Sequence, residues 1–433
     1  MRVLMLSWEY PPVMVGGLGR HVHALATALA KDGCQVTVVT RQGGSAPLEE
    51  HIDGVRVIRA PEDPPLFPLT SETLLSWTMA FNHALTRAAL HAAATSEQPY
   101  DIVHAHDWLV THAAVTLKHA LGLPLVATIH ATEAGRHSGW LPEQTNRCIH
   151  SVEWWLTYEA RRVLVCSAYM RWEVSRLFEL PRGKVQVVPN GVQPQLWQIP
   201  QRATAAARAR YPTTGPLIVY AGRLVYEKGV QDLLAAVPEL RAKHPGLHVA
   251  IAGDGPHRQE LEEQVRQLRI GSAVSFTGFL NDQELPALLA AADALVAPSR
   301  YEPFGMIALE AFAAGTPVVA ASTGGLAEII DPGVTGLTFP AAQPAALAAS
   351  VDALLADEVL ARRLARQAKT TARREHDWGA IAGHTVAAYQ KATADERSFA
   401  ARVAAGGAHA SSTAQPRIVV PSGNLLSDEA AAP

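Results

Sequence analysis

The sequence predicts an α/β protein with two domains, each built on a parallel sheet that helices cover on both faces. Short strands rich in Val, Ile and Leu alternate with helical stretches, which is the pattern of buried parallel strands. This alternation ends near residue 190 and begins again at residue 217. The length of 433 residues and a hydrophobic content of 48% allow two separate cores.

The first domain is predicted over residues 1–190. A strand at 2–7 runs into a loop rich in Pro and Gly, and a helix is expected at 21–31. Its further strands are predicted at 35–40, 55–58, 102–104, 125–129 and 163–165. The boundary is placed in VVPNGV, residues 187–192, where a strand meets a Pro-Asn-Gly turn.

The second domain is predicted over residues 191–376. Its strands are expected at 217–221, 248–252, 274–277, 294–297 and 317–320, and its helices at 229–240, 256–269, 282–291 and 305–314. Apolar residues then repeat at roughly helical spacing, from Trp378 to Tyr389, and predict a helix over about 377–392 that needs a surface to bury it. Residues 393–433 are rich in Ala, Gly, Ser and Pro and predict a disordered tail.

The composition argues against several classes of function. A formal net charge of −3 gives no overall attraction to nucleic acid. The chain has no run of about eighteen apolar residues that would span a membrane, and its N-terminal apolar run is too short for a secretory signal. The three cysteines are widely separated and form no CxxC pair. We therefore expect a cytoplasmic protein, whose oligomeric state, a homo-oligomer included, stays open.

The segment GGLG, residues 16–19, lies between the first strand and the first helix. Glycines let backbone amides approach an anion, and a helix N-terminus adds its positive end. The spacing is not GxGxxG, and Thr40 and Arg41 end the second strand where a nicotinamide site would have an acidic residue, so a nicotinamide cofactor is disfavoured. A tight turn explains GGLG equally well.

Two cations and two carboxylates in the second domain suit a sugar nucleotide. Arg223 and Lys228 follow a strand in AGRLVYEKG, where they are placed to meet phosphates. Glu302 and Glu310 lie eight residues apart in YEPFGMIALEAFAAGTP, the first in a loop and the second in an otherwise apolar helix. Eight residues at helical rise cover at most about 12 Å. This is the scale of a sugar joined through a diphosphate to a ribose, whose hydroxyls carboxylates can bind.

Histidines lie at the ends of two strands of the first domain, in HAHDW and TIHATEAGRHSGW. His130 ends a strand and opens a long polar loop, which favours a functional role. For His104 and His106 a structural role is as good an interpretation. The HxH spacing suggests zinc, but no third ligand lies at a suitable spacing, so we expect no metal.

Together these motifs resemble those of the family-4 retaining glycosyltransferases. That resemblance implies the GT-B fold, in which two Rossmann-like domains face each other across a cleft and a C-terminal helix crosses back to the first domain. The chain is similar to glycogen synthases and, in particular, to actinobacterial α-1,4-glucosyltransferases of glycogen and methylglucose polysaccharide synthesis. The resemblance covers roughly residues 1–392 and is carried, in the family's order, by SWEYPPVMVGGLGRHV, VHAHDW, TIHATEAGRHSGW, VVPNGV, AGRLVYEKGV, GDGP, FTGFL and the segment with two glutamates.

The resemblance implies roles for the residues at matching positions. Arg223 and Lys228 would neutralise the donor diphosphate, and Glu302 would hold the transferred sugar. His130 would contact that sugar near the reacting carbon, and Glu310 would bind the ribose hydroxyls. The implied catalytic residues are His130, Glu302, Arg223 and Lys228. The implied donor-binding residues are Gly16, Gly17, Asn190, Arg223, Lys228, Leu280, Glu302, Phe304, Gly305 and Glu310, and the acceptor-side residues are Asp107, Glu133, Arg136, His137 and Trp140.

The implied activity is retaining transfer of glucose from ADP-glucose or UDP-glucose to an α-1,4-glucan or a related oligosaccharide. No metal cofactor is implied, because fixed cations and amides would stabilise the departing diphosphate. Three alternatives stay open: a phosphatidylinositol-type mannosyltransferase, a sugar-nucleotide epimerase and a non-catalytic sugar-nucleotide binder. The first would need a membrane-facing basic or amphipathic stretch, and the first domain has no convincing one.

The sequence departs from better-known bacterial glycogen synthases just before the paired glycines. Those relatives carry a lysine at the position of Met14. The phosphate contact that this lysine would make is therefore absent here or comes from another residue, for example Arg20. Because its loss affects every nucleotide donor alike, we expect both ADP-glucose and UDP-glucose to be accepted.

Overall fold

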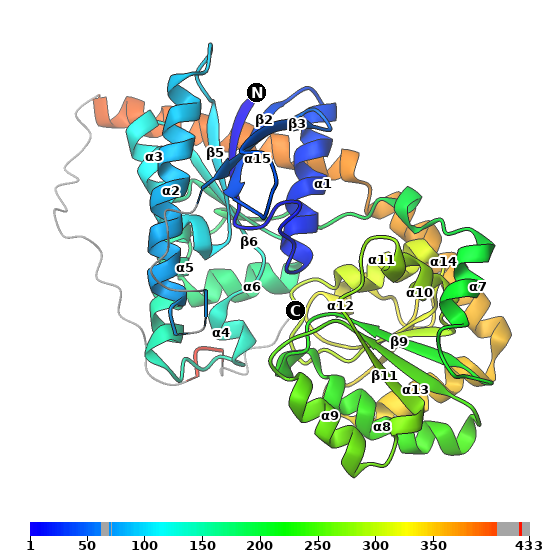
Figure 1. Ribbon diagram of the computed structural model, residues 1–433. Helices are drawn as coiled ribbons and strands as arrows, with labels where there is room; N and C mark the ends of the chain where they lie inside the picture. The colour runs from blue at the N-terminus through cyan, green and yellow to red at the C-terminus, as the bar shows by residue number, and fades with distance from the viewer. Residues whose placement is uncertain (62–68, 71, 405–423, 427–433) are drawn as a thin grey trace. The chain divides into compact units, whose positions relative to one another are not determined.

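The computed structural model describes residues 1–61, 69, 70, 72–404 and 424–426 (Figure 1). The chain divides into two compact units, which are Met1–Val188 together with Trp378–Pro433, and Pro189–Asp377. Each unit contains one largely or wholly parallel sheet with its own hydrophobic core. The predicted α/β fold is confirmed. No helix in the described ranges is both long enough and apolar enough to cross a bilayer.

The first unit contains an eight-stranded sheet in the order β3-β4-β2-β1-β5-β6-β7-β8. Every neighbouring pair is parallel except β3 and β4. The strands are β1 (Arg2–Leu6), β2 (Gln35–Arg41), β3 (Glu49–Ile52), β4 (Val55–Ala60), β5 (Ile102–His106), β6 (Leu125–Ile129), β7 (Arg162–Val165) and β8 (Val185–Val187). Strands β5 and β6 are buried along their whole length, as expected for central strands covered on both faces.

The helices of the first unit are α1 (Gly17–Lys31), α2 (Leu74–Ala94), α3 (Thr111–Leu121), α4 (Glu133–Arg136), α5 (Gln144–Glu159), α6 (Ala168–Leu177) and α15 (Trp378–Ala404), with a 3-10 turn η1 (Trp108–Val110). Helix α1 begins four residues before the predicted start, so its first turn includes part of GGLG. Its apolar face, which includes Val22, Leu25 and Leu29, is buried in the core.

Helix α15 returns the chain to the first unit. Trp378, Ile381 and Tyr389 belong to that unit's core, and the helix lies against α1. The helix continues to Ala404, so the prediction that disorder begins at residue 393 is wrong for residues 393–404. Glu396 forms an ion pair with Arg161, a contact between residues far apart in sequence that composition does not reveal. The predicted disorder of residues 405–423 and 427–433 concerns residues outside the described part of the chain.

The second unit contains a six-stranded parallel sheet in the order β11-β10-β9-β12-β13-β14. The strands are β9 (Leu217–Ala221), β10 (His248–Ala252), β11 (Val274–Gly278), β12 (Ala294–Ala297), β13 (Val318–Ala321) and β14 (Leu337–Phe339). The helices are α7 (Gln201–Arg208), α8 (Val230–Lys243), α9 (Arg258–Gln267), α10 (Glu284–Ala291), α11 (Met306–Ala314), α12 (Leu326–Ile329), α13 (Pro344–Ala356) and α14 (Glu358–Glu375), with 3-10 turns η2 (Pro194–Trp197), η3 (Tyr226–Lys228) and η4 (Gly271–Ala273).

In both sheets the strand order reverses next to the first strand of the unit. The reversal falls between β1 and β5 in the first unit and between β9 and β12 in the second. The loops after two such strands run to opposite sides of the sheet, which opens a crevice at their carboxyl ends where α/β proteins bind ligands. These two points contain most of the residues singled out from the sequence.

Candidate functional site

Lys228 and Glu302 form an ion pair at the reversal point of the second unit. The Nζ of Lys228 lies 2.8 Å from Oε2 of Glu302, and the Ser299 hydroxyl donates a hydrogen bond to the same oxygen at 3.1 Å. Lys228 comes from η3 after β9, whereas Ser299 and Glu302 come from the loop after β12. The two side chains are 19% and 11% exposed, so their charges are only partly screened by water.

Close packing between the two loops positions this pair. A Cβ atom on Gly229 would lie 1.9 Å from the carbonyl oxygen of Pro298, and Gly229 has a φ of +70°. Only glycine fits this backbone and this contact. Arg300 then ties the loop after β12 to α8 through two hydrogen bonds to Asp232, at 2.9 and 2.7 Å. Ser299, Asp232 and Arg300 were not predicted from the sequence. Asp232 and Arg300 are far apart along the chain, whereas Ser299 is only three residues from Glu302 but belongs to no motif that marks it.

Arg223 and Leu280 lie on the same edge of the sheet as this pair. Arg223 follows β9, is 43% exposed at its side chain and lies 3.9 Å from Glu227. Its carbonyl accepts a hydrogen bond from the hydroxyl of Tyr220 at 2.8 Å, which holds the backbone after the strand. Leu280 lies on the loop after β11, the last strand on this side of the sheet. The order of the strands therefore brings these residues to one edge.

The segment from Phe304 to Glu310 begins helix α11 beside Glu302. Gly305 has a φ of +108°, and a Cβ there would lie 2.6 Å from Cδ2 of Leu326, so this turn requires glycine. Glu310 is 2% exposed, a depth at which a carboxylate is costly without polar partners.

Asn190 is buried near the start of the second unit. Its carbonyl accepts a hydrogen bond from Nδ1 of His376 at 3.0 Å, and the His376 ring packs edge-on against Phe304. This contact links Asn190 to the Phe304 loop within one unit.

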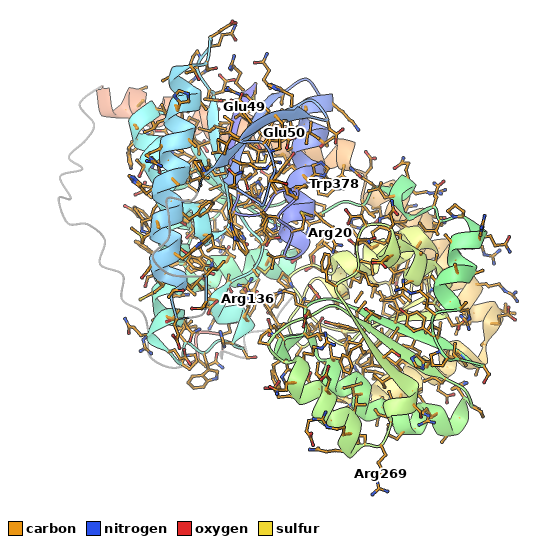
Figure 2. All side chains as sticks on the ribbon, in the orientation of Figure 1. Arg20, Glu49, Glu50, Arg136, Arg269 and Trp378 are labelled. Carbon is orange, nitrogen blue, oxygen red and sulfur yellow. The ribbon has the colours of Figure 1, made fainter. Side chains whose placement is uncertain are left out.

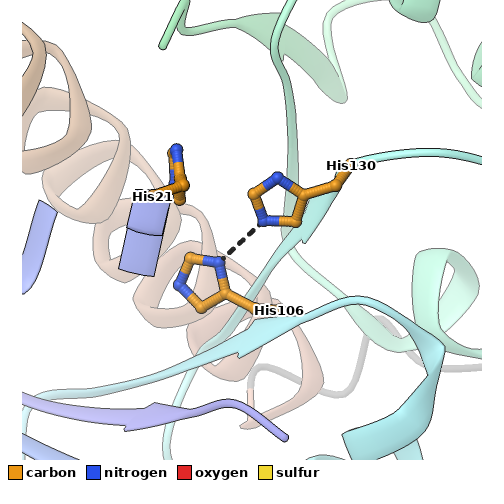
Figure 3. A group of neighbouring side chains, drawn as sticks. All are labelled: His21, His106 and His130. Atoms are coloured by element: carbon orange, nitrogen blue, oxygen red, sulfur yellow. Dashed lines mark hydrogen bonds between the residues drawn. The ribbon is translucent and has the colours of Figure 1, made fainter. Parts of the chain in front are cut away.

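Three histidines meet at the reversal point of the first unit (Figure 3). His21 comes from α1, His106 ends β5 and His130 follows β6, and one ring nitrogen of each lies within 4.8 Å of the other two. Nδ1 of His106 and Nε2 of His130 are 3.1 Å apart and share a hydrogen bond. The spacing of this cluster is one that a borderline metal ion such as Zn²⁺ can accept. His21, the third member of the cluster, was not predicted from the sequence, because it lies on a helix far from the HxH segment.

Burial keeps the imidazoles of His106 and His130 neutral. It lowers the pKa of His130 to about 3 and holds the pKa of His106 well below its usual range. His130 can therefore donate or accept a hydrogen bond near neutral pH but does not act as an imidazolium acid. His104 has a structural role, because its ring nitrogens bond to the hydroxyls of Tyr389 and Thr128, each at 2.7 Å.

Glu9 is a residue of this site that the sequence analysis missed. Its Oε2 accepts hydrogen bonds from the amides of Val15 at 2.8 Å and Gly16 at 3.0 Å. The carboxylate thus caps the N-terminus of α1 and takes the Gly16 amide that was expected to face a phosphate. Phosphate binding by Gly16 stays a prediction and would require Glu9 to release this amide. The sequence feature that could have pointed to Glu9 is an acidic residue in the loop between β1 and GGLG.

Met14 takes part in packing around the same loop. A Cβ atom on Gly19 would lie 2.7 Å from the sulfur of Met14 and 3.1 Å from Oε2 of Glu9. The position that is lysine in better-known relatives is therefore close to α1 here. Arg20 lies one residue beyond Gly19 on the same helix and is labelled in Figure 2.

Three of the expected acceptor-side residues, Glu133, Arg136 and His137, form a cluster around the buried Glu133 carboxylate. Glu133 accepts a hydrogen bond from Asn146 at 2.6 Å, and its carboxylate also lies near Arg136 and His137, at 3.9 and 3.3 Å. The Glu133 amide donates to Glu153 at 2.9 Å, and burial together with the Glu133 charge holds the pKa of Glu153 well above its usual range. Arg136 is labelled in Figure 2.

Asp107 and Trp140 lie on either side of this cluster in the sequence. Asp107 accepts a hydrogen bond from the backbone amide of His130 at 2.7 Å, which joins the loops after β5 and β6. Trp140 is 54% exposed. An exposed indole is available to stack on a sugar ring.

Asp107 provides a pH-dependent test. Burial raises the pKa of its carboxyl to about 6 from an ordinary value of 3.8, although the hydrogen bond from His130 opposes this rise. Between pH 3.8 and about 6, the Asp107 carboxyl keeps its proton in the folded state and loses it in the unfolded state. Stability therefore falls as pH rises from 3.8 to 6 and stays lower above it, by up to about 3 kcal/mol.

Asp107→Asn keeps an oxygen acceptor for the His130 amide but cannot ionise. We expect this variant to gain stability over the unmodified chain at pH 7 and to lose that gain near pH 4. Denaturant unfolding at the two pH values measures the difference, with the exposed Asp282→Asn as control. The same stability difference at both pH values would contradict the raised pKa.

Comparison with known proteins agrees with this geometry. Residues 15–196 match the family described as Glycosyltransferase Family 4, and residues 201–371 match glycosyl transferases group 1. The chain is 45% identical over 408 residues to glycogen synthase of Mycobacterium tuberculosis, covering 92% of this chain and 96% of that protein. It is 34% identical over 427 residues to D-inositol 3-phosphate glycosyltransferase of Kineococcus radiotolerans, covering 91% and 96%.

The structure is similar to that of sucrose-phosphate synthase from Thermosynechococcus elongatus, with a TM-score of 0.79 and 26% identity over 91% of this chain and all of that chain. Two Rossmann-like units, each with polar residues at its reversal point, define a glycosyltransferase of the GT-B class. The chain belongs to glycosyltransferase family 4 and is a hexosyltransferase.

Proposed function

We propose that this enzyme transfers glucose from a nucleotide-glucose donor to an α-1,4-glucan or a related oligosaccharide, with retention at the sugar carbon. The observation that carries the proposal is the Lys228–Glu302 pair at the β9–β12 reversal point, with Arg223 on the same edge. This arrangement supports the proposal, because cations suit a diphosphate and a carboxylate beside them suits sugar hydroxyls. The 45% identity to a glycogen synthase supports glucose and a glucan as substrates.

The proposed chemistry breaks the bond between the sugar carbon and the diphosphate oxygen. Positive charge develops on the sugar carbon and negative charge on the departing diphosphate. Lys228 and Arg223 would stabilise the diphosphate because their charges are in place before the reaction. The acceptor hydroxyl would attack from the side of the leaving group and pass its proton to a phosphate oxygen, so that the new bond keeps the original configuration.

The other site residues would bind and orient the donor. Glu302 would bind sugar hydroxyls while Lys228 and Ser299 hold its carboxylate, and Glu310 would bind the ribose. His130 would contact the sugar as a neutral imidazole, because its pKa is lowered to about 3. The amides of Phe304 and Gly305, with Asn190 and Leu280, would complete the donor site in the second unit.

The acceptor side favours a neutral saccharide over a phosphorylated one. Glu133 is acidic, and the nearby cation Arg136 already lies 3.9 Å from it. A phosphate placed there would meet like charge. A D-inositol 3-phosphate acceptor is the second candidate, because a relative at 34% identity carries that name.

An assay with a matrix of donors and acceptors tests this function. We expect transfer from ADP-glucose and from UDP-glucose to maltooligosaccharides, with kcat/KM values that differ by less than about a hundredfold, or roughly 2.7 kcal/mol. The product linkage should be α. Absolute selectivity for one nucleotide would contradict the donor prediction, and transfer only from a mannose or N-acetylglucosamine donor, or only to D-inositol 3-phosphate, would contradict the proposed activity. Reactions without acceptor would reveal an epimerase.

We also expect the reaction to need no metal, because Lys228 and Arg223 supply fixed positive charge. Incubation with EDTA should leave the initial rate unchanged within about twofold. A rate that falls with EDTA and returns with Zn²⁺ would contradict this expectation and point to the cluster of His21, His106 and His130. Dependence on Mg²⁺ or Mn²⁺ would instead point to a metal bound with the diphosphate.

A further inference from the structure

A short C-terminal segment, residues 424–426, lies against the loop that follows α4 in the first unit. The side-chain amide of Asn424 donates a hydrogen bond to the carbonyl of Ser138 at 3.1 Å. The backbone amide of Leu425 donates to the carbonyl of Gly139 at 2.7 Å. Figure 1 shows the segment as the short red piece beside α4. Two adjacent carbonyls of one loop thus bind two adjacent residues that are almost 300 positions away.

The two surfaces fit closely. Gly139 has a φ of +89°, and a Cβ atom at this position would lie 1.8 Å from Oδ1 of Asn424. Only a residue without a side chain allows this approach. The same Oδ1 accepts a hydrogen bond from the amide of Leu426 at 2.9 Å, which holds the segment in a turn. All three residues of the segment are partly buried.

The loop under this segment is the one assigned to the acceptor side. It begins at His137, which lies 3.3 Å from Glu133 of α4, and reaches the exposed Trp140, which directly follows Gly139. We propose that the Ser138–Gly139 turn is a docking site for the chain's own C-terminal segment, and that the docked segment competes with the saccharide acceptor. The competition rests on the proposed function, whereas the docking does not.

The contact is of a strength that an acceptor can displace. Neutral hydrogen bonds contribute little once exchange with water is counted. A segment on the same chain nevertheless acts at an effective concentration on the order of millimolar. The segment should therefore occupy the Ser138–Gly139 turn for only part of the time. Its removal should lower KM for a short glucan by roughly two- to tenfold and leave KM for the donor unchanged. Long glucans, which have more contacts, should be affected less.

Docking can be measured without any substrate. The test compares the full chain with a chain that ends at residue 423 and with a matched control that ends at residue 426. Hydrogen exchange of the peptide that covers residues 133–143 should be slower in the full chain and in the control than in the chain ending at 423. Exchange that is the same in all three would overturn the docking site.

Kinetics then tests competition. With maltotriose or maltotetraose as acceptor, the chain ending at 423 should have the lower KM, and the control should match the full chain. The double variant Asn424→Ala with Leu425→Pro, which removes both donors to the loop, should behave like the shorter chain. Competition would be overturned if the segment slows hydrogen exchange of the loop but its removal leaves the acceptor KM unchanged. It would also be overturned if the chains ending at 423 and 426 show the same change in acceptor KM.

A failure of the proposed function would give a different set of results. In that case the full chain and all variants would transfer no glucose, while hydrogen exchange would still decide the docking. Added peptide of residues 421–430 supplies one more discriminating result. At millimolar concentration it should inhibit the chain ending at 423 competitively against the glucan, and inhibition competitive only against the donor would overturn the assignment to the acceptor side.

Discussion

Replacing Lys228 by Ala is expected to lower kcat/KM at least about a hundredfold while the fold stays intact. Its ammonium lies 2.8 Å from Glu302 at the β9–β12 reversal point, where the donor diphosphate is proposed to bind. Loss of one preorganised group that stabilises developing negative charge typically costs about 10²–10³ in turnover. Arg223→Ala should have a comparable effect, and Glu302→Gln should lose most of the transfer.

The matched control is Lys243→Ala. Lys243 is 44% exposed and bonds to Glu239 and Asp352 on the surface, so its removal should leave kcat/KM within about twofold. Circular dichroism and melting temperature would show that each variant is folded. Activity close to that of the unmodified enzyme in both Lys228→Ala and Arg223→Ala would remove the proposed diphosphate site.

Deleting the chain from Trp378 onward is expected to unfold the first unit. The deletion removes α15, whose Trp378, Ile381 and Tyr389 are 7%, 1% and 0% exposed in the core of that unit. Burial of each such side chain contributes about 1.5–3 kcal/mol. Their sum is comparable with the 5–15 kcal/mol that typically stabilises a domain. His21, whose ring centroid lies 5.4 Å from that of Trp378, would also lose this neighbour.

A chain that ends at Ala404 is the control, and its melting temperature should be unchanged. A chain cut at residue 393, where the tail was predicted to begin, would lose Phe399, whose ring centroid lies 4.2 Å from the guanidinium carbon of Arg161. The single variant Tyr389→Ala gives a graded readout, with an expected loss of about 3–5 kcal/mol. A chain ending at Asp377 that melts like the full chain would contradict the role assigned to α15.

The central strands and the helices between them were predictable because their apolar residues are contiguous in sequence. The strands that were missed lie at sheet edges. Strand β3 reads EEHI and is half-exposed, and β14 has three residues, so neither shows the apolar run of a buried strand. Helix α15 was predicted from its apolar spacing, but its end at Ala404 depends on contacts such as that of Glu396 with Arg161.

The sequence by itself determined the fold class and the positions of Arg223, Lys228 and Glu302, because the order of strands and the motifs after them are local properties. The tertiary structure decided which groups those residues meet. Glu9 takes the Gly16 amide, and Asn424 reaches Ser138, through contacts that only the folded chain brings together. A pattern along the chain predicts which residues are buried and where turns occur. Hydrogen bonds between loops depend on residues that come within bonding distance only when the sheets and helices have packed.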